Sequence, residues 1–185
     1  VPLVQVPSAD AWGFAGAAPF HSAETWLGRA PDADDRVQEL VLRYLAAFGP
    51  ASVTDAQAWS GRGGLKPAFE ALRPQLLTFK DARGRELFDL PDAPRPDPAT
   101  PAPVRFLPDF DNLVLAHDDR SRVIATEHRK LVTTANLQVK ATFLVDGRVA
   151  GTWKVAATKT KATLTLSPFG ELAPAARDAL HDEGQ

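Results

Sequence analysis

The most constraining feature of this sequence is the stretch from Val37 to Leu90, in which three predicted helices precede a predicted β-hairpin. In the first predicted helix, apolar residues recur at the spacing of one helix face. They are Val37, Leu40, Val41, Tyr44, Leu45 and Phe48. Gly49-Pro50 should end this helix, because glycine accepts a left-handed cap and proline cannot continue the helix.

Two shorter helices are predicted next. Thr54 and Gln57 have the spacing of a capping box, which predicts the start of a helix that ends at Ser60-Gly61. After the glycine-rich link 61–64, apolar residues at 65, 69 and 72 share one face of a third helix over 65–73. Pro67 falls in its first turn, where proline is tolerated.

The third helix is followed by two extended segments, 76–80 and 85–90, around the turn 81–84. Leu77 and Phe79 alternate with their neighbours, as in a half-buried strand, and Gly84 can supply the positive φ of the turn. Three helices and a two-stranded hairpin are typical of the winged-helix variant of the helix-turn-helix. In that variant the third helix enters a DNA major groove and the hairpin contacts the adjacent backbone.

The remaining sequence predicts four segments. We interpret residues 1–31 as the remnant of a preceding wing, with a return strand over 12–20, followed by a linker. The winged-helix domain covers 32–91. Residues 92–103 carry five prolines, which predicts an extended linker. Residues 104–185 predict a small antiparallel β-barrel with a C-terminal helix, so the fold class is α+β.

The predicted strands of the last segment are short. Asp146-Gly147 favours a two-residue turn in a hairpin over 138–155, and 163–166 would add the next strand. Further short strands are predicted at 106–107, 113–115, 123–124 and 131–134, and an amphipathic helix at 171–183.

Charge is unevenly distributed along the chain. The net charge of −2 argues against a uniformly basic nucleic-acid coat, so DNA binding would need a local patch. The third helix and hairpin carry six cations against three carboxylates, and 32–60 is acidic. The predicted DNA contacts are Arg62, Lys66, Arg73, Lys80, Arg83, Arg85 and Lys154. Lys159 and Lys161, near Lys154, could also face phosphate, although a solvated strand face explains them equally well. The alternative interpretation is an ordinary solvated helix face and a charged turn.

The sequence gives little support for metal sites, for cysteine chemistry or for a membrane-spanning helix. The absence of cysteine excludes disulfides, thiolate metal sites and a cysteine nucleophile. Six Asp and His residues gather between 109 and 128, but their spacing fits no metal loop, and capping roles are expected. They are Asp109, Asp111, His117, Asp118, Asp119 and His128. We expect no cofactor and no metal, and no apolar run is long enough for a membrane helix.

Several longer motifs carry a resemblance to a known family. They are 43–51 (RYLAAFGPA), 54–61 (TDAQAWSG), 86–92 (ELFDLPD), 106–113 (FLPDFDNL), 117–120 (HDDR) and 144–153 (LVDGRVAGTW). With them the chain resembles the winged-helix DNA-binding domain-containing proteins of actinobacteria. That superfamily includes bacterial alkylpurine DNA glycosylases able to unhook interstrand crosslinks.

The resemblance implies tandem winged helices followed by a β-barrel, arranged around DNA. In that superfamily the catalytic pair is a Gln-x-Gln or Gln-x-Asp motif near the N-terminus. No glutamine here has Gln or Asp two positions later, so no catalytic residue is carried over. The resemblance therefore implies the C-terminal portion of such a protein, which binds DNA without cutting it.

The predicted function is thus a DNA-binding winged-helix module of a glycosylase-like repair protein. We expect its partner to be double-stranded DNA, damaged DNA included. A cytoplasmic monomer without membrane contact is expected. The alternative is a winged-helix module for protein interaction or transcription regulation, which the acidic first helix favours. A self-contained enzyme is the weakest of the hypotheses.

Overall fold

The computed structural model describes residues 2–6, 19–30 and 35–185 of the chain. It divides into two compact units, Val1–Arg36 and Val37–Gln185. In the first, β1 (Leu3–Gln5) pairs antiparallel with β2 (Phe20–Ser22), and α1 (Ala23–Leu27) follows. The expected strand pair is therefore present, although its return strand begins only at Phe20. The rest of the segment expected to form that strand, up to residue 18, lies outside the described residues.

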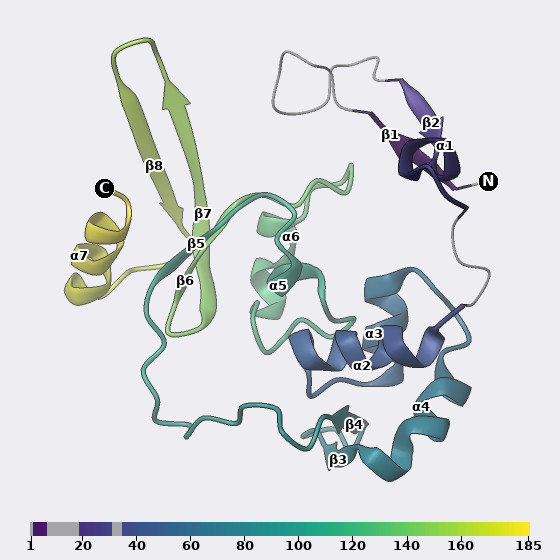
Figure 1. Ribbon diagram of the computed structural model, residues 1–185. Helices are drawn as coiled ribbons and strands as arrows, with labels where there is room; N and C mark the ends of the chain where they lie inside the picture. The colour runs from purple at the N-terminus through teal and green to yellow at the C-terminus, as the bar shows by residue number, and fades with distance from the viewer. Residues whose placement is uncertain (1, 7–18, 31–34) are drawn as a thin grey trace. The chain divides into compact units, whose positions relative to one another are not determined.

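The second unit begins with three helices and a hairpin, in the predicted order (Figure 1). They are α2 (Val37–Phe48), α3 (Val53–Ser60), α4 (Lys66–Leu72), the 3₁₀ turn η1 (Arg73–Gln75), β3 (Leu77–Lys80) and β4 (Glu86–Asp89). Their buried core includes Tyr44, Phe69 and Phe88. The rings of Phe69 and Phe88 pack with centroids 5.1 Å apart, so the hairpin is fixed to α4.

Two predicted helix ends differ in detail. The N-cap of α3 is Ser52 rather than Thr54, and its capping box uses Asp55, because the helix starts one residue before Thr54. Gly49 ends α2 without adopting a positive φ. A Cβ atom at Gly49 would collide with the Asp89 carboxylate and with the Leu45 carbonyl, so this position is glycine for lack of space.

The first strand of the β3–β4 hairpin is more exposed than the alternation predicts. All four residues of β3 are exposed, whereas Leu87, Phe88 and Asp89 of β4 are buried. Leu77 and Phe79 are thus only partly covered. The reason is that β4 also bridges Ala51 and places Phe88 in the core of the three helices.

The C-terminal part of the second unit contains a four-stranded antiparallel sheet. Its order is β5 (Arg105–Leu107), β6 (Thr142–Val145), β7 (Arg148–Ala157), β8 (Ala162–Pro168). The prediction of Asp146-Gly147 as the β6–β7 turn is confirmed, because both residues have positive φ. No helix or strand lies between β4 and β5, where the proline-rich linker was expected.

The expected barrel is wrong. Within residues 104–185, all of which the structure describes, β5 and β8 do not pair, so the sheet stays open. β5 has three residues and cannot supply a second long edge. The helix α7 (Pro174–Glu183) contacts the edge strand β5, since Glu183 binds Arg105 at 3.2 Å, and the adjoining Gly184 lies against Leu164 of β8.

Three predicted short strands are also wrong. Residues 113–115 lie in α5 (Asn112–Leu115), residues 123–124 lie in a turn, and the segment 131–134 begins inside α6 (Arg129–Val132), which follows the 3₁₀ turn η2 (Thr126–His128). The Asp111 carboxylate accepts the amide of Leu113 and caps α5. Apolar runs this short do not distinguish strand from helix.

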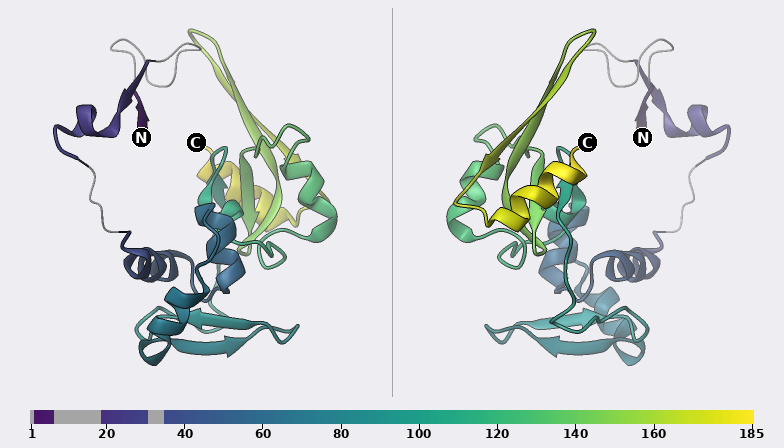
Figure 2. Two further views of the ribbon diagram at one scale, coloured as in Figure 1. Left: turned by 90° about the vertical axis from the view of Figure 1, so that its right-hand side faces the viewer. Right: turned by 90° about the vertical axis from the view of Figure 1, so that its left-hand side faces the viewer.

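β7 and β8 form the longest strand pair in the described part of the chain. They pair from Gly151↔Pro168 to Ala157↔Ala162. Their outer half, which we call the β7–β8 arm (residues 154–165), extends away from the sheet in all views (Figures 1 and 2). None of the described helices has both the length and the apolar character needed to cross a membrane.

Candidate nucleic-acid interface

Arg73, predicted to contact DNA from the third helix, binds two carboxylates within its own module. Its guanidinium donates to Glu70 at 2.8 Å and to Glu86 at 2.9 Å. It also lies 5.0 Å from the centre of the Phe88 ring. Hydrogen bonds from Arg73 hold the pKa values of both carboxyl groups below their usual range. The two carboxylates neutralise the charge of Arg73 itself, and Lys66 and Lys80 also lower the pKa of Glu86 from nearby.

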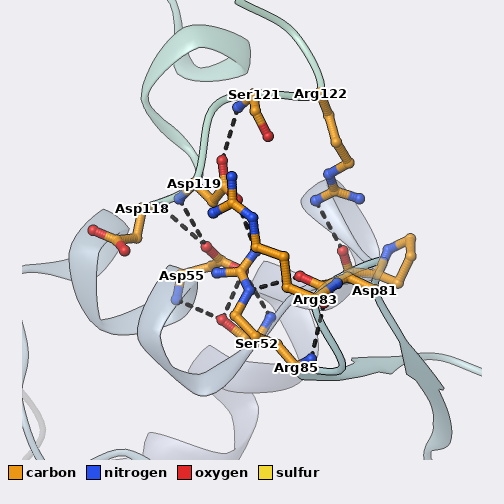
Figure 3. A network of polar contacts seen from close by, with 10 residues as sticks. Ser52, Asp55, Asp81, Arg83, Arg85, Asp118, Asp119, Ser121 and Arg122 are labelled. Atoms are coloured by element: carbon orange, nitrogen blue, oxygen red, sulfur yellow. Dashed lines mark hydrogen bonds and ion pairs between the residues drawn. The ribbon is translucent and has the colours of Figure 1, made fainter. Parts of the chain in front are cut away.

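Arg83 and Arg85, predicted as the best phosphate contacts, also lie against carboxylates (Figure 3). Arg85 donates to Asp81 at 2.6 Å and to Asp119 at 3.1 Å. Arg83 forms an ion pair of 3.2 Å with the same Asp119 oxygen, and its side chain remains 69% exposed. The hairpin turn is therefore tied by charge to the segment that follows α5.

Asp55 is the buried centre of this network, with only 2% of its surface exposed. One carboxylate oxygen accepts the backbone amide and the hydroxyl of Ser52, at 2.8 and 2.7 Å. The other accepts the amides of Asp118 and Asp119, at 3.0 and 3.4 Å. Burial by itself raises the pKa of Asp55, but the hydrogen bonds from Ser52 and Asp119 outweigh it and keep the pKa low.

Residues 112–122, here called the docking segment, bind the three-helix module at further points. The Tyr44 hydroxyl donates to the Ala116 carbonyl at 2.7 Å. His117 Nε2 lies 3.0 Å from the Phe48 carbonyl, and because that carbonyl accepts, this nitrogen carries the proton. Arg122 donates to the Pro50 carbonyl. The side of the module that carries Arg83 and Arg85 is therefore an internal interface.

The cluster of acidic and histidine residues between 109 and 128 has capping and docking roles. Asp109 accepts the amide of Ala141, and Asp111 caps α5. His117 and Asp119 belong to the docking segment just described, and the His128 ring packs on Phe169. Among the described residues, no group of three such side chains comes together to hold a metal ion.

The structure does not gather the predicted cations into one patch. Arg73 lies with Glu70 and Glu86, whereas Arg83 and Arg85 lie with Asp119. Arg62, Lys66 and Lys80 are exposed. With the residues that the structure describes, neither Lys66 nor Lys80 forms an ion pair.

A more strongly cationic region lies in the C-terminal part. Residues 128–170 carry a single carboxylate, Asp146, against seven Lys and Arg side chains. They are Arg129, Lys130, Lys140, Arg148, Lys154, Lys159 and Lys161. The rest of the chain is correspondingly acidic, so the basic residues are segregated. Counting charge along the whole chain, and not only within the helix-and-hairpin motif, would have found this region.

The β7–β8 arm presents three of these lysines. Lys154, Lys159 and Lys161 are all exposed, and the turn at its tip is closed by hydrogen bonds between Thr158 and Lys161. The other residues of the arm are alanine, threonine, valine and one leucine, so the ribbon is narrow. Between Lys154 and Thr165 there is no carboxylate to compete with phosphate.

A cavity of about 560 Å³ lies at the base of the arm. Lys140 and Lys154 line it together with Trp153 and one carboxylate, Asp109. The Trp153 indole donates to the Leu107 carbonyl at 2.9 Å, which fixes the ring on the sheet. The cavity therefore extends the cationic surface from the arm onto the body of the sheet.

Comparison with known proteins shows what kind of protein carries this surface. The family model described as "DNA glycosylase AlkZ-like" matches residues 1–185. The chain belongs to this family. The AlkZ-like chain is also 29% identical, over 151 residues, to the interstrand DNA cross-link repair glycosylase of Streptomyces sahachiroi. The match covers 77% of this chain and 39% of that protein.

A solved structure shares the fold of the AlkZ-like chain. The Streptomyces sahachiroi DNA glycosylase AlkZ superimposes with a TM-score of 0.72 at 24% identity. The superposition covers 98% of this chain and 49% of that one. The chain thus spans less than half the length of either relative, and the likeness to the solved structure shows the fold alone.

Proposed function

We propose that this AlkZ-like chain is a duplex-DNA-binding part of a DNA repair glycosylase and contacts DNA mainly through the β7–β8 arm. The observation that carries the proposal is the segregation of seven cations against one carboxylate in residues 128–170. Each phosphate neutralised by lysine or arginine releases counterions, which is the main source of non-specific affinity for DNA.

The shape of the arm supports the same proposal. A two-stranded β-ribbon fits a DNA major groove, and small side chains let its backbone approach closely. Lys159 and Lys161 stand at the tip and Lys154 nearer the base, so the cations are spread along the ribbon. The arm can therefore reach several phosphates along one groove.

The three-helix module with its β3–β4 hairpin is a secondary contact in this proposal, as a winged helix. Lys66 and Lys80 are available to phosphate, whereas Arg73, Arg83 and Arg85 would first have to leave their carboxylates. Exposed ion pairs contribute about 0–1 kcal/mol, so a phosphate can compete with them. The paired arginines also favour a second role for this module, contact with protein.

The relatives suggest what the whole protein does. One of them is named as a glycosylase for interstrand DNA cross-link repair. We propose the same class of substrate, alkylated or crosslinked DNA, for the protein to which this chain belongs, without assigning a catalytic residue. Our expectation of a cytoplasmic monomer remains part of this proposal.

The test is binding of a short fluorescent duplex, measured by anisotropy at several salt concentrations. Lys154→Ala, Lys159→Ala and Lys161→Ala combined should weaken binding roughly 100-fold at low salt and reduce the salt slope by about 3. The matched control is Lys66→Ala with Lys80→Ala, which removes two exposed lysines from the other module. Equal losses in both variants, or binding independent of salt, would contradict the proposal.

A further inference from the structure

Leu137 combines two unusual features. Its surface is 77% exposed, the largest value among the exposed large apolar residues of the described chain. Its backbone also has φ of +61°, a left-handed conformation that a branched side chain rarely adopts. Such residues persist only where the surrounding structure holds them, and they concentrate at functional sites.

The turn that carries Leu137 is firmly closed. The Leu137 amide donates to the Thr134 carbonyl at 3.0 Å, and the Thr134 amide donates to the Gln138 carbonyl at 2.9 Å. The Thr134 hydroxyl accepts the Gln138 amide, and Thr133 pairs with Val139 below the turn. The leucine is therefore presented to solvent on a rigid support, so little ordering entropy opposes its use in binding.

Phe110 has the same pair of features on the adjoining loop. It has φ of +58° and is 52% exposed. Its amide donates to the carbonyl of Val139, so the two loops are held side by side. The carboxylates that flank it, Asp109 and Asp111, accept the amides of Ala141 and Leu113 and keep their negative charge, so Phe110 lies on the acidic side of the pair and Leu137 on the other.

The charge of the segment that carries Leu137 favours a polyanion. Residues 128–145 contain Arg129, Lys130 and Lys140 and no carboxylate. Lys140 also lines the cavity that reaches Lys154 at the base of the arm. An exposed apolar side chain set among cations fits a DNA groove, where proteins insert such side chains between base steps and kink the duplex.

We propose that Leu137, with Phe110 on the adjoining loop, inserts between stacked bases of the duplex that the arm binds. This inference rests on the proposed function, since the arm must first hold the DNA. Insertion costs least where stacking is already weak, at a mismatched or damaged pair. The substrate class that this feature selects is therefore duplex DNA with a locally unstable base pair.

The experiment uses the full chain and a short duplex with one 2-aminopurine opposite cytosine, a mismatch whose fluorescence rises on unstacking. Binding is followed by anisotropy on the same samples. The wild type should raise the fluorescence several-fold at saturation. Leu137→Ala should abolish most of that rise while weakening binding less than tenfold. Leu137→Lys, which adds a cation, should bind at least as well and also lose the rise.

The matched control is Val155→Ala, which shortens an exposed apolar residue of the arm and should keep the full rise. Saturated binding without a fluorescence rise, or a rise unchanged in both Leu137 variants, overturns the insertion and leaves the proposed function standing. If the wild type gives no anisotropy change at low salt, the proposed function fails and the insertion fails with it.

Discussion

The arginines of the β3–β4 hairpin and the lysines of the β7–β8 arm both lie on exposed two-stranded ribbons, but their surroundings differ. Arg83 and Arg85 share Asp119, and Arg85 also binds Asp81. Lys159 and Lys161 have no carboxylate within their arm. The arginines of the first ribbon bind the docking segment, whereas no carboxylate of the arm neutralises the lysines of the second. A cation's position on a motif is therefore a weaker guide to binding than the carboxylates around it.

The largest expected effect is a loss of folding stability at the interface where the docking segment binds the three-helix module and its hairpin arginines. Asp55→Ala removes the acceptor of Ser52, Asp118 and Asp119 and leaves their donors unpaired, so it should lower the free energy of unfolding by about 3 kcal/mol. The measurement is chemical denaturation of the full chain. Asp55→Asn keeps one acceptor oxygen and should lose less. Equal stability of both variants and the wild type would mean that the docking segment is held by other contacts.

The same interface should respond to pH through His117. Burial lowers the pKa of His117 in the folded chain, and Arg122 lowers it further. The unfolded chain therefore takes up the proton first, near the ordinary pKa of about 6.5. The stability that the folded chain gains from neutral His117 is complete above that pH. It is lost as pH falls towards the folded-state pKa.

Denaturation at pH 7.5 and 5.5 checks this prediction. The wild type should be less stable at pH 5.5, and His117→Gln, whose amide can still donate to Phe48, should show a smaller difference between the two pH values. A difference just as large in the variant would place its origin in another group.

A smaller effect, on DNA affinity, is expected when the carboxylate that pairs with the hairpin arginines is neutralised. Asp119→Asn removes the charge that Arg83 and Arg85 share, so it should raise affinity for duplex DNA by about threefold if the hairpin lies close to phosphate. Anisotropy at low salt measures it, with Asp178→Asn on α7 as the charge-matched control. If both variants change affinity alike, the gain comes only from net charge.

The smallest effect is expected from the hairpin arginines themselves. Because their charge is already matched, Arg83→Ala with Arg85→Ala should weaken DNA binding less than about threefold. The same titration and salt series measure it. A loss comparable to that of the arm lysines would reverse the roles assigned to the two ribbons.

Much of the fold follows from local sequence signals. The helices α2, α3 and α4 were predictable because their apolar spacing and end signals involve residues a few positions apart. The turn at Asp146-Gly147 is equally local. The helical turn at residues 113–115 was not predictable, because a three-residue apolar run fits a strand as well as a helix. The Asp111 side chain, which caps α5, favours the helix.

The site was less predictable because it depends on contacts distant in sequence. Asp119 lies 34 residues beyond Arg85, and nothing local shows that the two side chains meet. The open sheet likewise depends on α7, which packs beside β5 from the far end of the chain. By contrast, the scarcity of carboxylates in 128–170 is visible in the sequence, and Lys154, with Lys159 and Lys161 nearby, was already considered as a phosphate contact.

The most direct test of the central claim is lysine acetylation of the full chain with and without bound duplex DNA, read by mass spectrometry. Every lysine is then compared within one molecule. DNA should protect Lys154, Lys159 and Lys161 strongly and Lys66 and Lys80 much less. Protection of Lys66 and Lys80 with an unprotected arm would contradict this account and return the DNA contact to the three-helix module.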